Sequence, residues 1–128
     1  MDTGITRISS RHSVAQMMER LESLIKERGL MIFARIDFSG DAARAGLTMR
    51  PEQMLIFGNP RAGTPLMQSE PAAGLDLPLK ALVWEDADGR TQIAYNDPQY
   101  IVRRHGLDPA LAANLAVVVP LLERAAGD

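Results

Sequence analysis

The segment from Gly58 to Thr64 combines residue types that can hold a ligand. It reads Gly-Asn-Pro-Arg-Ala-Gly-Thr, and its two glycines let the backbone approach a bound molecule closely. Asn59 and Thr64 can donate and accept hydrogen bonds, and Arg61 can form charge-assisted bonds to an anion. Neither the P-loop spacing nor the dinucleotide-binding glycine spacing occurs in the chain. The segment therefore allows two interpretations: a turn that links a strand to a helix, or a site for an anion or another small molecule.

Tyr95 with Asn96, and Arg35 with Asp37, are further polar pairs that could belong to such a site. Tyr95 offers a hydroxyl and Asn96 an amide at the end of a predicted strand. Arg35 and Asp37 are two residues apart on another strand, so they share a face as an ion pair or as pocket walls. We predict one site whose ligand-binding residues are Asn59, Arg61, Thr64, Tyr95, Asn96, Arg35 and Asp37. The alternative is that Asn59 caps a helix, Tyr95 packs, and the loop only turns the chain.

No set of residues typical of catalysis appears in the sequence. The nucleophile motif G-x-S-x-G does not occur, and the absence of cysteine removes thiol nucleophiles and thiolate metal sites. His12 and His105 are far apart, and neither has a carboxylate at ligand spacing, so we predict no metal site. No cofactor is indicated. We favour a non-enzymatic binding or structural module, with an enzyme or small-molecule-binding protein as the alternative.

Composition indicates a single soluble domain spanning residues 1–128. The 14 Lys and Arg residues nearly balance 16 Asp and Glu residues, and 46% of the chain is hydrophobic. No basic block marks a nucleic-acid surface. The longest fully apolar run, Leu115 to Leu122, contains Pro120 and is much shorter than the about 20 residues of a membrane span. We therefore expect a cytoplasmic protein with no nucleic-acid or membrane partner.

The clearest secondary-structure signal is a helix after Ser13 that ends near Gly29. Its apolar residues recur at three- and four-residue steps, which places them on one face: Val14, Met17, Met18, Leu21, Leu24 and Ile25. Ser13 is the expected cap and Gly29 the expected stop. This stripe predicts packing against a sheet or another helix.

Alternating and short apolar runs predict the strands. They are expected at 5–10, 30–38, 54–57, 79–86 and 91–96, with an Asp-Gly hairpin turn at 88–89. A helix from Ser39 to Gly46 follows the second strand, and Ser39 is its expected cap. The third strand, Met54 to Phe57, is apolar on both sides and needs cover on both faces, from this chain or from a partner. The order predicts an α+β domain with one mixed or antiparallel sheet of about five strands packed by helices.

Prolines divide the helical segments. Because a residue before proline avoids the helical region, Asn59 and Thr64 are expected to start separate turns, with a helix only from Thr64 to Gln68. A short helix is expected from Asp97 to His105. The last helix, 108–126, contains Pro120, and we expect a kink or break between Ala116 and Pro120.

The last helix also suggests an assembly. Its apolar residues surround it almost completely, which predicts burial on more than one side. A second copy of the chain is the simplest source of that cover, so we expect a homodimer with this helix in its interface.

The string from Phe57 to Gln68 resembles the bacterial domain of unknown function 302 family. Shorter strings at Leu75–Lys80, Val83–Asp86, Tyr95–Pro98 and Arg104–Gly106 continue the resemblance, which spans about residues 4 to 120. It implies a compact α+β domain, often dimeric, with no established reaction. One departure is Phe38, which stands where relatives commonly have His. If that His serves a ligand or proton role in relatives, this chain has lost it.

Overall fold

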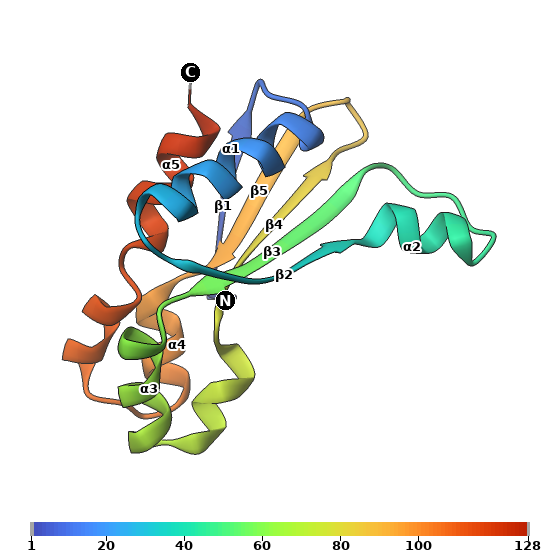
Figure 1. Ribbon diagram of the computed structural model, residues 1–128. Helices are drawn as coiled ribbons and strands as arrows, with labels where there is room; N and C mark the ends of the chain where they lie inside the picture. The colour runs from blue at the N-terminus through green and yellow to red at the C-terminus, as the bar shows by residue number, and fades with distance from the viewer. Residues whose placement is uncertain (1, 128) are drawn as a thin grey trace.

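The computed structural model describes residues 2–127 and contains one five-stranded antiparallel sheet (Figure 1). The strands are β1 (Ile5–Ser10), β2 (Met31–Asp37), β3 (Glu52–Gly58), β4 (Leu79–Glu85) and β5 (Thr91–Asn96), in the order β1-β5-β4-β3-β2. The helices are α1 (Val14–Glu27), α2 (Phe38–Arg44), α3 (Pro60–Ser69), α4 (Pro98–Arg104) and α5 (Val118–Ala126), with 3-10 helices η1 (Pro71–Asp76) and η2 (Pro109–Asn114). The predicted α+β fold is confirmed, and every strand pair is antiparallel.

The hydrophobic core lies between one face of the sheet and helices α1 and α5 (Figure 1). Met17, Met18, Leu21 and Ile25 of α1 are fully buried, as the predicted stripe requires. They meet side chains that alternate along the strands: Leu55, Phe57, Ala81, Val83 and Ile93. Ser13 caps α1 and forms a reciprocal capping box with Gln16, so this end of the helix was predicted correctly.

The opposite face of the sheet has no helix over it within residues 2–127 (Figure 1). Met54 and Ile56 of β3 point to this side and stay partly exposed. The prediction that β3 is covered on both faces therefore holds within this chain for one face only.

The connection from β2 to β3, which contains α2, extends beyond the body of the domain as an arm (Figure 1). The expected start of its helix at Ser39 is wrong, because α2 begins at Phe38 and Asp37 is the cap. The Asp37 carboxylate accepts bonds from the Gly40 N–H at 3.0 Å and the Ser39 hydroxyl at 2.8 Å. These bonds stop the strand at Asp37, so Phe38 is helical and is not the last residue of the strand as predicted.

The expected break between Asn59 and Thr64 is also wrong. Helix α3 is continuous from Pro60 to Ser69, with Asn59 as its cap and Pro65 in its interior. Pro65 lacks the N–H that would bond the carbonyl of Arg61, a cost of about 3 kcal/mol. Leu66, the next residue, is fully buried, and this burial stabilises the folded state by about 1.5–3 kcal/mol. Tertiary burial thus offsets the local preference against a helical residue before proline.

The C-terminal segment is interrupted, as its proline predicts. η2 and α5 are separated by a turn at Leu115–Val117, and Pro120 falls in the first turn of α5. A proline there breaks no helical bond, since N–H groups in a first turn have no helical partner. By length and composition the segment Pro109–Ala126 could also span a membrane, with a mean hydropathy of 1.3.

The inward side of α5 is covered by its own chain. The apolar side of α5 packs on α1, β1 and β5 of the same chain, which buries Val118, Leu121, Leu122, Ala125 and Ala126. The domain's own core therefore accounts for the apolar residues on the inward side of the segment, and 39% of Pro109–Ala126 is buried in this way. No second copy is needed to cover these residues.

Replacing Leu121 by Ala tests this core. Leu121 is fully buried, so the substitution leaves a cavity and lowers the free energy of unfolding by about 2–5 kcal/mol. Urea denaturation measures the loss. The matched control is Leu75→Ala on η1, where the leucine is 76% exposed and the expected change is within about 0.5 kcal/mol. Equal effects of the two substitutions would contradict the packing described.

Asp37 provides a second test. The bonds from Gly40 and Ser39 lower the pKa of Asp37, so its charged form stabilises α2 above the usual carboxyl range, and this contribution is lost as the pH falls through the lowered pKa. We expect Ser39→Ala to move the pKa of Asp37 back up toward its ordinary value, because a donor to the carboxylate is removed. A carbon-detected NMR titration of the carboxyl group gives both midpoints, and identical midpoints would count against the cap.

Candidate functional site

A cavity of about 520 Å³ lies where β3 leads into α3. Four separate stretches of chain enclose it: the start of β2, the corner between β3 and α3, the entry to β4, and the turn between η2 and α5. Exposed residues at its rim, including Phe33, Thr64 and Met67, show that it opens to solvent.

The wall of the cavity is mainly apolar. Its apolar side chains are Leu30, Phe33, Pro60, Ala62, Met67, Leu77, Pro78, Leu79, Leu115 and Val117. Asn59, Thr64 and Asn114 are its polar side chains, and no residue that lines it is charged. This mixture is typical of a small-molecule site, in which a few polar groups orient a largely apolar ligand.

Local bonds hold the polar side chains in place. Asn59 Oδ1 accepts a bond from the Arg61 N–H at 3.0 Å, which caps α3. Asn114 Nδ2 donates to the Ala62 carbonyl at 3.1 Å and thereby ties η2 to the first turn of α3. The Asn59 amide nitrogen and the Asn114 carbonyl oxygen are not used in these two bonds, so one donor and one acceptor are left for a ligand.

The structure brings together two of the seven predicted site residues. Asn59 and Thr64 line the cavity, whereas Arg61 lies on α3 and is exposed outside it. Tyr95 is 6% exposed and belongs to the core, where burial raises the pKa of its hydroxyl. Asn96 lies at the end of β5 opposite Ile5 and does not line the cavity.

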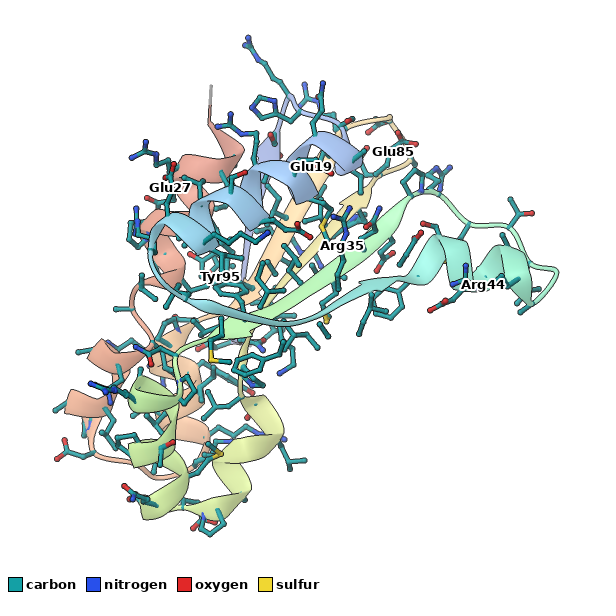
Figure 2. The ribbon with its side chains drawn as sticks, viewed as in Figure 1. Glu19, Glu27, Arg35, Arg44, Glu85 and Tyr95 are labelled. Atoms are coloured by element: carbon teal, nitrogen blue, oxygen red, sulfur yellow. The ribbon has the colours of Figure 1, made fainter. Side chains whose placement is uncertain are left out.

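Arg35 and Asp37 also lie away from the cavity, and neither predicted arrangement describes them. Arg35 Nη1 binds Glu22 Oε1 of α1 at 2.9 Å, and its Nε donates to Gln53 at 3.1 Å. Figure 2 shows Arg35 on the side of the sheet that α1 covers. Asp37 caps α2, so the two residues are neither pocket walls nor mainly partners of each other.

Sequence reasoning missed most of the cavity wall. Asn114 is 52 residues from the carbonyl that it binds, and Phe33, Leu77 and Val117 come from three further parts of the chain. The glycines and cap residues at 58–64 predicted one wall of the cavity, because such patterns involve only neighbouring residues in the sequence. The remaining walls depend on the packing of distant segments.

A second, more polar hollow of about 830 Å³ lies at the N-terminal end of α1. Several of its polar groups are already engaged within the chain. Ser13 and Gln16 form the capping box, Ser10 Oγ donates to the Ala126 carbonyl, and His12 Nε2 lies 2.8 Å from the Gly127 carbonyl. This hollow is therefore the weaker candidate.

His105 is paired, although the sequence showed no carboxylate near it. Its Nε2 lies 2.6 Å from Asp76 Oδ2 of η1, and Arg104 Nη1 binds Asp76 Oδ1 at 3.0 Å. These contacts join the end of α4 to η1. Within residues 2–127 no three His, Asp or Glu side chains gather as metal ligands would.

The chain matches a protein family, a solved structure and curated proteins. The family model described as domain of unknown function DUF302 matches residues 6–124. A crystal structure of an uncharacterized conserved DUF302 protein from Bacillus stearothermophilus has the same fold, with a TM-score of 0.79 at 22% identity, over 98% of this chain and 97% of that one.

Two curated relatives from Brucella are named as channels. The chain is 41% identical over 132 residues to fluoride-specific ion channel FluC 1 of Brucella suis biovar 1, covering all of this chain and 52% of that protein. The protein of the same name from Brucella abortus biovar 1 is also 41% identical and is 49% covered. The chain thus spans about half the length of these relatives.

Proposed function

Because this chain belongs to the domain of unknown function 302 family, whose name states no activity, we propose its function from the cavity beside α3. It is a non-catalytic module that binds a small, uncharged and largely apolar molecule. The observation that carries this proposal is the composition of the cavity wall, which has ten apolar side chains, three neutral polar ones and no charge.

The size and polarity of the cavity support this ligand class. Its volume of about 520 Å³ is within the range of roughly 300–1,000 Å³ common for small-molecule sites. Apolar contact gives about 25 cal/mol per Å² buried, while an unpaired charge in such surroundings costs several kcal/mol. The wall therefore favours a neutral ligand over the anion that the glycines and Arg61 suggested.

The same wall supports a binding role over an enzymatic one. General acid–base or nucleophilic catalysis needs a titratable or activated group within reach of the ligand. The residues lining this cavity offer Asn59, Asn114 and the Thr64 hydroxyl, and none of them titrates near neutral pH.

A matched pair of fluorescent probes tests the ligand class. N-phenyl-1-naphthylamine is neutral, and 1-anilinonaphthalene-8-sulfonate adds one sulfonate to the same ring system. We expect saturable fluorescence enhancement with the neutral probe and binding weaker by about tenfold or more with the sulfonate, because the wall has no cation to pair with it. Equal affinities, or no enhancement with the neutral probe, would contradict the proposal.

Gly63 supplies the site-specific control for this experiment. It lines the cavity, and a Cβ placed on it would meet no atom nearer than Leu77 Cδ1 at 3.9 Å. Gly63→Leu should fill the space and abolish probe binding. Gly63→Ala should keep binding and raise the unfolding temperature, since alanine favours a helix by about 1 kcal/mol over glycine. If Gly63→Leu binds the probe normally, the probe lies elsewhere.

A second candidate function comes from the Brucella relatives. In these proteins a region similar to this chain shares a polypeptide with about as much additional sequence, under the name of a fluoride-specific ion channel. We propose that this domain is an accessory to ion transport and that the additional half contains the pore. The expected cytoplasmic location fits such a domain beside a membrane protein.

The packing of the apolar C-terminal segment supports the accessory role. Seven residues of the span-length segment are core residues: Ala112, Leu115, Val118, Leu121, Leu122, Ala125 and Ala126. β1 and β2 are the open edges of the sheet, and the unpaired backbone groups of such edges would be unsatisfied in lipid. Neither feature suits a transmembrane pore.

Truncation of the Brucella suis relative tests this role. Removing the half that matches this chain should leave fluoride efflux from proteoliposomes measurable, whereas removing the other half should abolish it. Each truncated protein is first checked by size-exclusion chromatography, so that a loss of folding is not read as a loss of transport. Efflux that depends on the matched half alone would refute the accessory role.

A further inference from the structure

The first turn of α3 uses its backbone N–H groups within the chain. The Arg61 N–H donates to Asn59 Oδ1 at 3.0 Å, and the N–H groups of Ala62 and Gly63 donate to the Asn59 carbonyl at 2.9 and 3.0 Å. Pro60, the first residue of the helix, has no N–H. This turn therefore does not offer an anion the free N–H groups that a helix N-terminus usually presents. Polar recognition of a ligand in the cavity falls to side chains.

The two asparagines of the cavity have their amide groups fixed in opposite senses. The Arg61 N–H requires an acceptor, so Asn59 turns its oxygen to that bond and has its NH₂ group left over. The Ala62 carbonyl requires a donor, so Asn114 turns its Nδ2 to that bond and has its Oδ1 left over. Among residues 2–127 neither leftover group has a further hydrogen-bond partner.

The leftover donor and the leftover acceptor lie at the same end of the cavity. The groups that hold the two asparagines, the Arg61 N–H and the Ala62 carbonyl, belong to consecutive residues of one helical turn, and both asparagines line the cavity. An amide is a neutral group that carries one acceptor and one donor on adjacent atoms, so it matches both asparagines. A ketone pairs with Asn59 and leaves Asn114 Oδ1 without a donor.

Two exposed apolar side chains at the rim favour an aromatic ring on the ligand. Phe33 is 45% exposed and Met67 is 38% exposed, and both line the cavity. Phe33 Cε2 lies 3.9 Å from the position that a Cβ on Gly58 would occupy, so the Phe33 ring is beside the residue that precedes Asn59. A ring that covers these side chains gains aromatic contact with Phe33 and a sulfur contact with Met67, in addition to apolar burial.

We propose that the ligand of this cavity is an aromatic amide, with its ring on Phe33 and Met67 and its amide group on Asn59 and Asn114. The ligand carbonyl accepts a bond from Asn59 Nδ2, and the ligand N–H donates to Asn114 Oδ1. Primary carboxamides and lactams share this pair of groups. The assignment rests on the proposed binding function and names the chemistry of its ligand.

Four compounds with one ring system test the assignment. 2-Naphthamide carries a donor and an acceptor, 2-acetonaphthone has a methyl group in place of the NH₂, 2-naphthalenemethanol carries a hydroxyl, and 2-naphthoate carries a charge. Titrations followed by proton–nitrogen NMR give the dissociation constants. We expect the amide to bind about tenfold more tightly than the ketone, because the ketone leaves Asn114 Oδ1 unpaired. The side-chain NH₂ signals of Asn59 and Asn114 should shift when the amide binds.

The outcomes separate this assignment from the function on which it rests. An amide that binds no more tightly than the ketone or the alcohol would overturn the assignment and leave the binding of neutral apolar molecules standing. Preference for the naphthoate would refute the neutral-ligand function itself. The same conclusion follows if none of the four compounds binds and N-phenyl-1-naphthylamine also fails to bind.

Asn59→Asp changes the polarity of the site and keeps the helix cap. Aspartate caps helices as well as asparagine does, so the bond from the Arg61 N–H remains, while a carboxylate oxygen replaces the Nδ2 donor. The variant should bind 2-naphthamide about tenfold more weakly. It should instead prefer the cationic 2-naphthamidine, whose N–H groups suit both the carboxylate and Asn114 Oδ1.

Gln68→Glu is the matched control for this substitution. It makes the same change from amide to carboxylate at an exposed position of α3 that does not line the cavity, and it should leave all the affinities unchanged. Circular dichroism and the unfolding temperature check that each variant is folded. An Asn59→Asp protein that still prefers the amide to the amidine would overturn the proposal. The comparison of amide and ketone on the wild-type chain decides it without any substitution.

Discussion

Burial of one face of the sheet beneath α1 and α5 is the constraint on which the rest of the structure depends. The stripe of α1 and the alternating residues of β3, β4 and β5 form one continuous core. Since apolar burial is the main favourable term in folding, this contact decides which side of every strand faces inward. It also explains why the C-terminal segment breaks at Leu115–Val117: α5 must lie across α1 and β5, whereas η2 lies beside α3 and α4.

The same constraint creates the two surfaces with functional interest. α3, η1 and η2 pack at one end of the sheet (Figure 1). The cavity lies where α3 meets the start of β2, the entry to β4 and the turn after η2. No helix within residues 2–127 covers the far face of the sheet, where Met54 and Ile56 stay partly exposed (Figure 1). A neutral ligand in the cavity fits the proposed module, which binds a molecule without catalysing a reaction. The Brucella relatives contain a region similar to this chain within proteins named fluoride-specific ion channels.

Charged residues near these surfaces mainly position backbone elements. Asp37 starts α2, Arg35 ties β2 to α1, and Asp76 joins η1 to α4 through Arg104 and His105. Residue type alone suggested a ligand role for Arg35 and Asp37. Arg35 binds Glu22, 13 residues away in the sequence, and Asp37 binds Ser39 and Gly40, two and three residues away. Both residues therefore have structural roles, because their polar groups already form bonds that hold the fold together.

The sequence by itself determined the features that depend on local periodicity and caps. The α1 stripe and its capping box, the strands of the hairpin, the α+β order and the break before Pro120 were all predictable, since each arises from residues a few positions apart. Only tertiary structure decided that α3 continues through Pro65, because the burial of Leu66 opposes the local preference. It alone gathered the cavity wall from four stretches of chain, separated Tyr95 and Arg35 from Asn59, and left one face of the sheet open. These features follow from contacts between residues far apart in the sequence, and no local pattern records them.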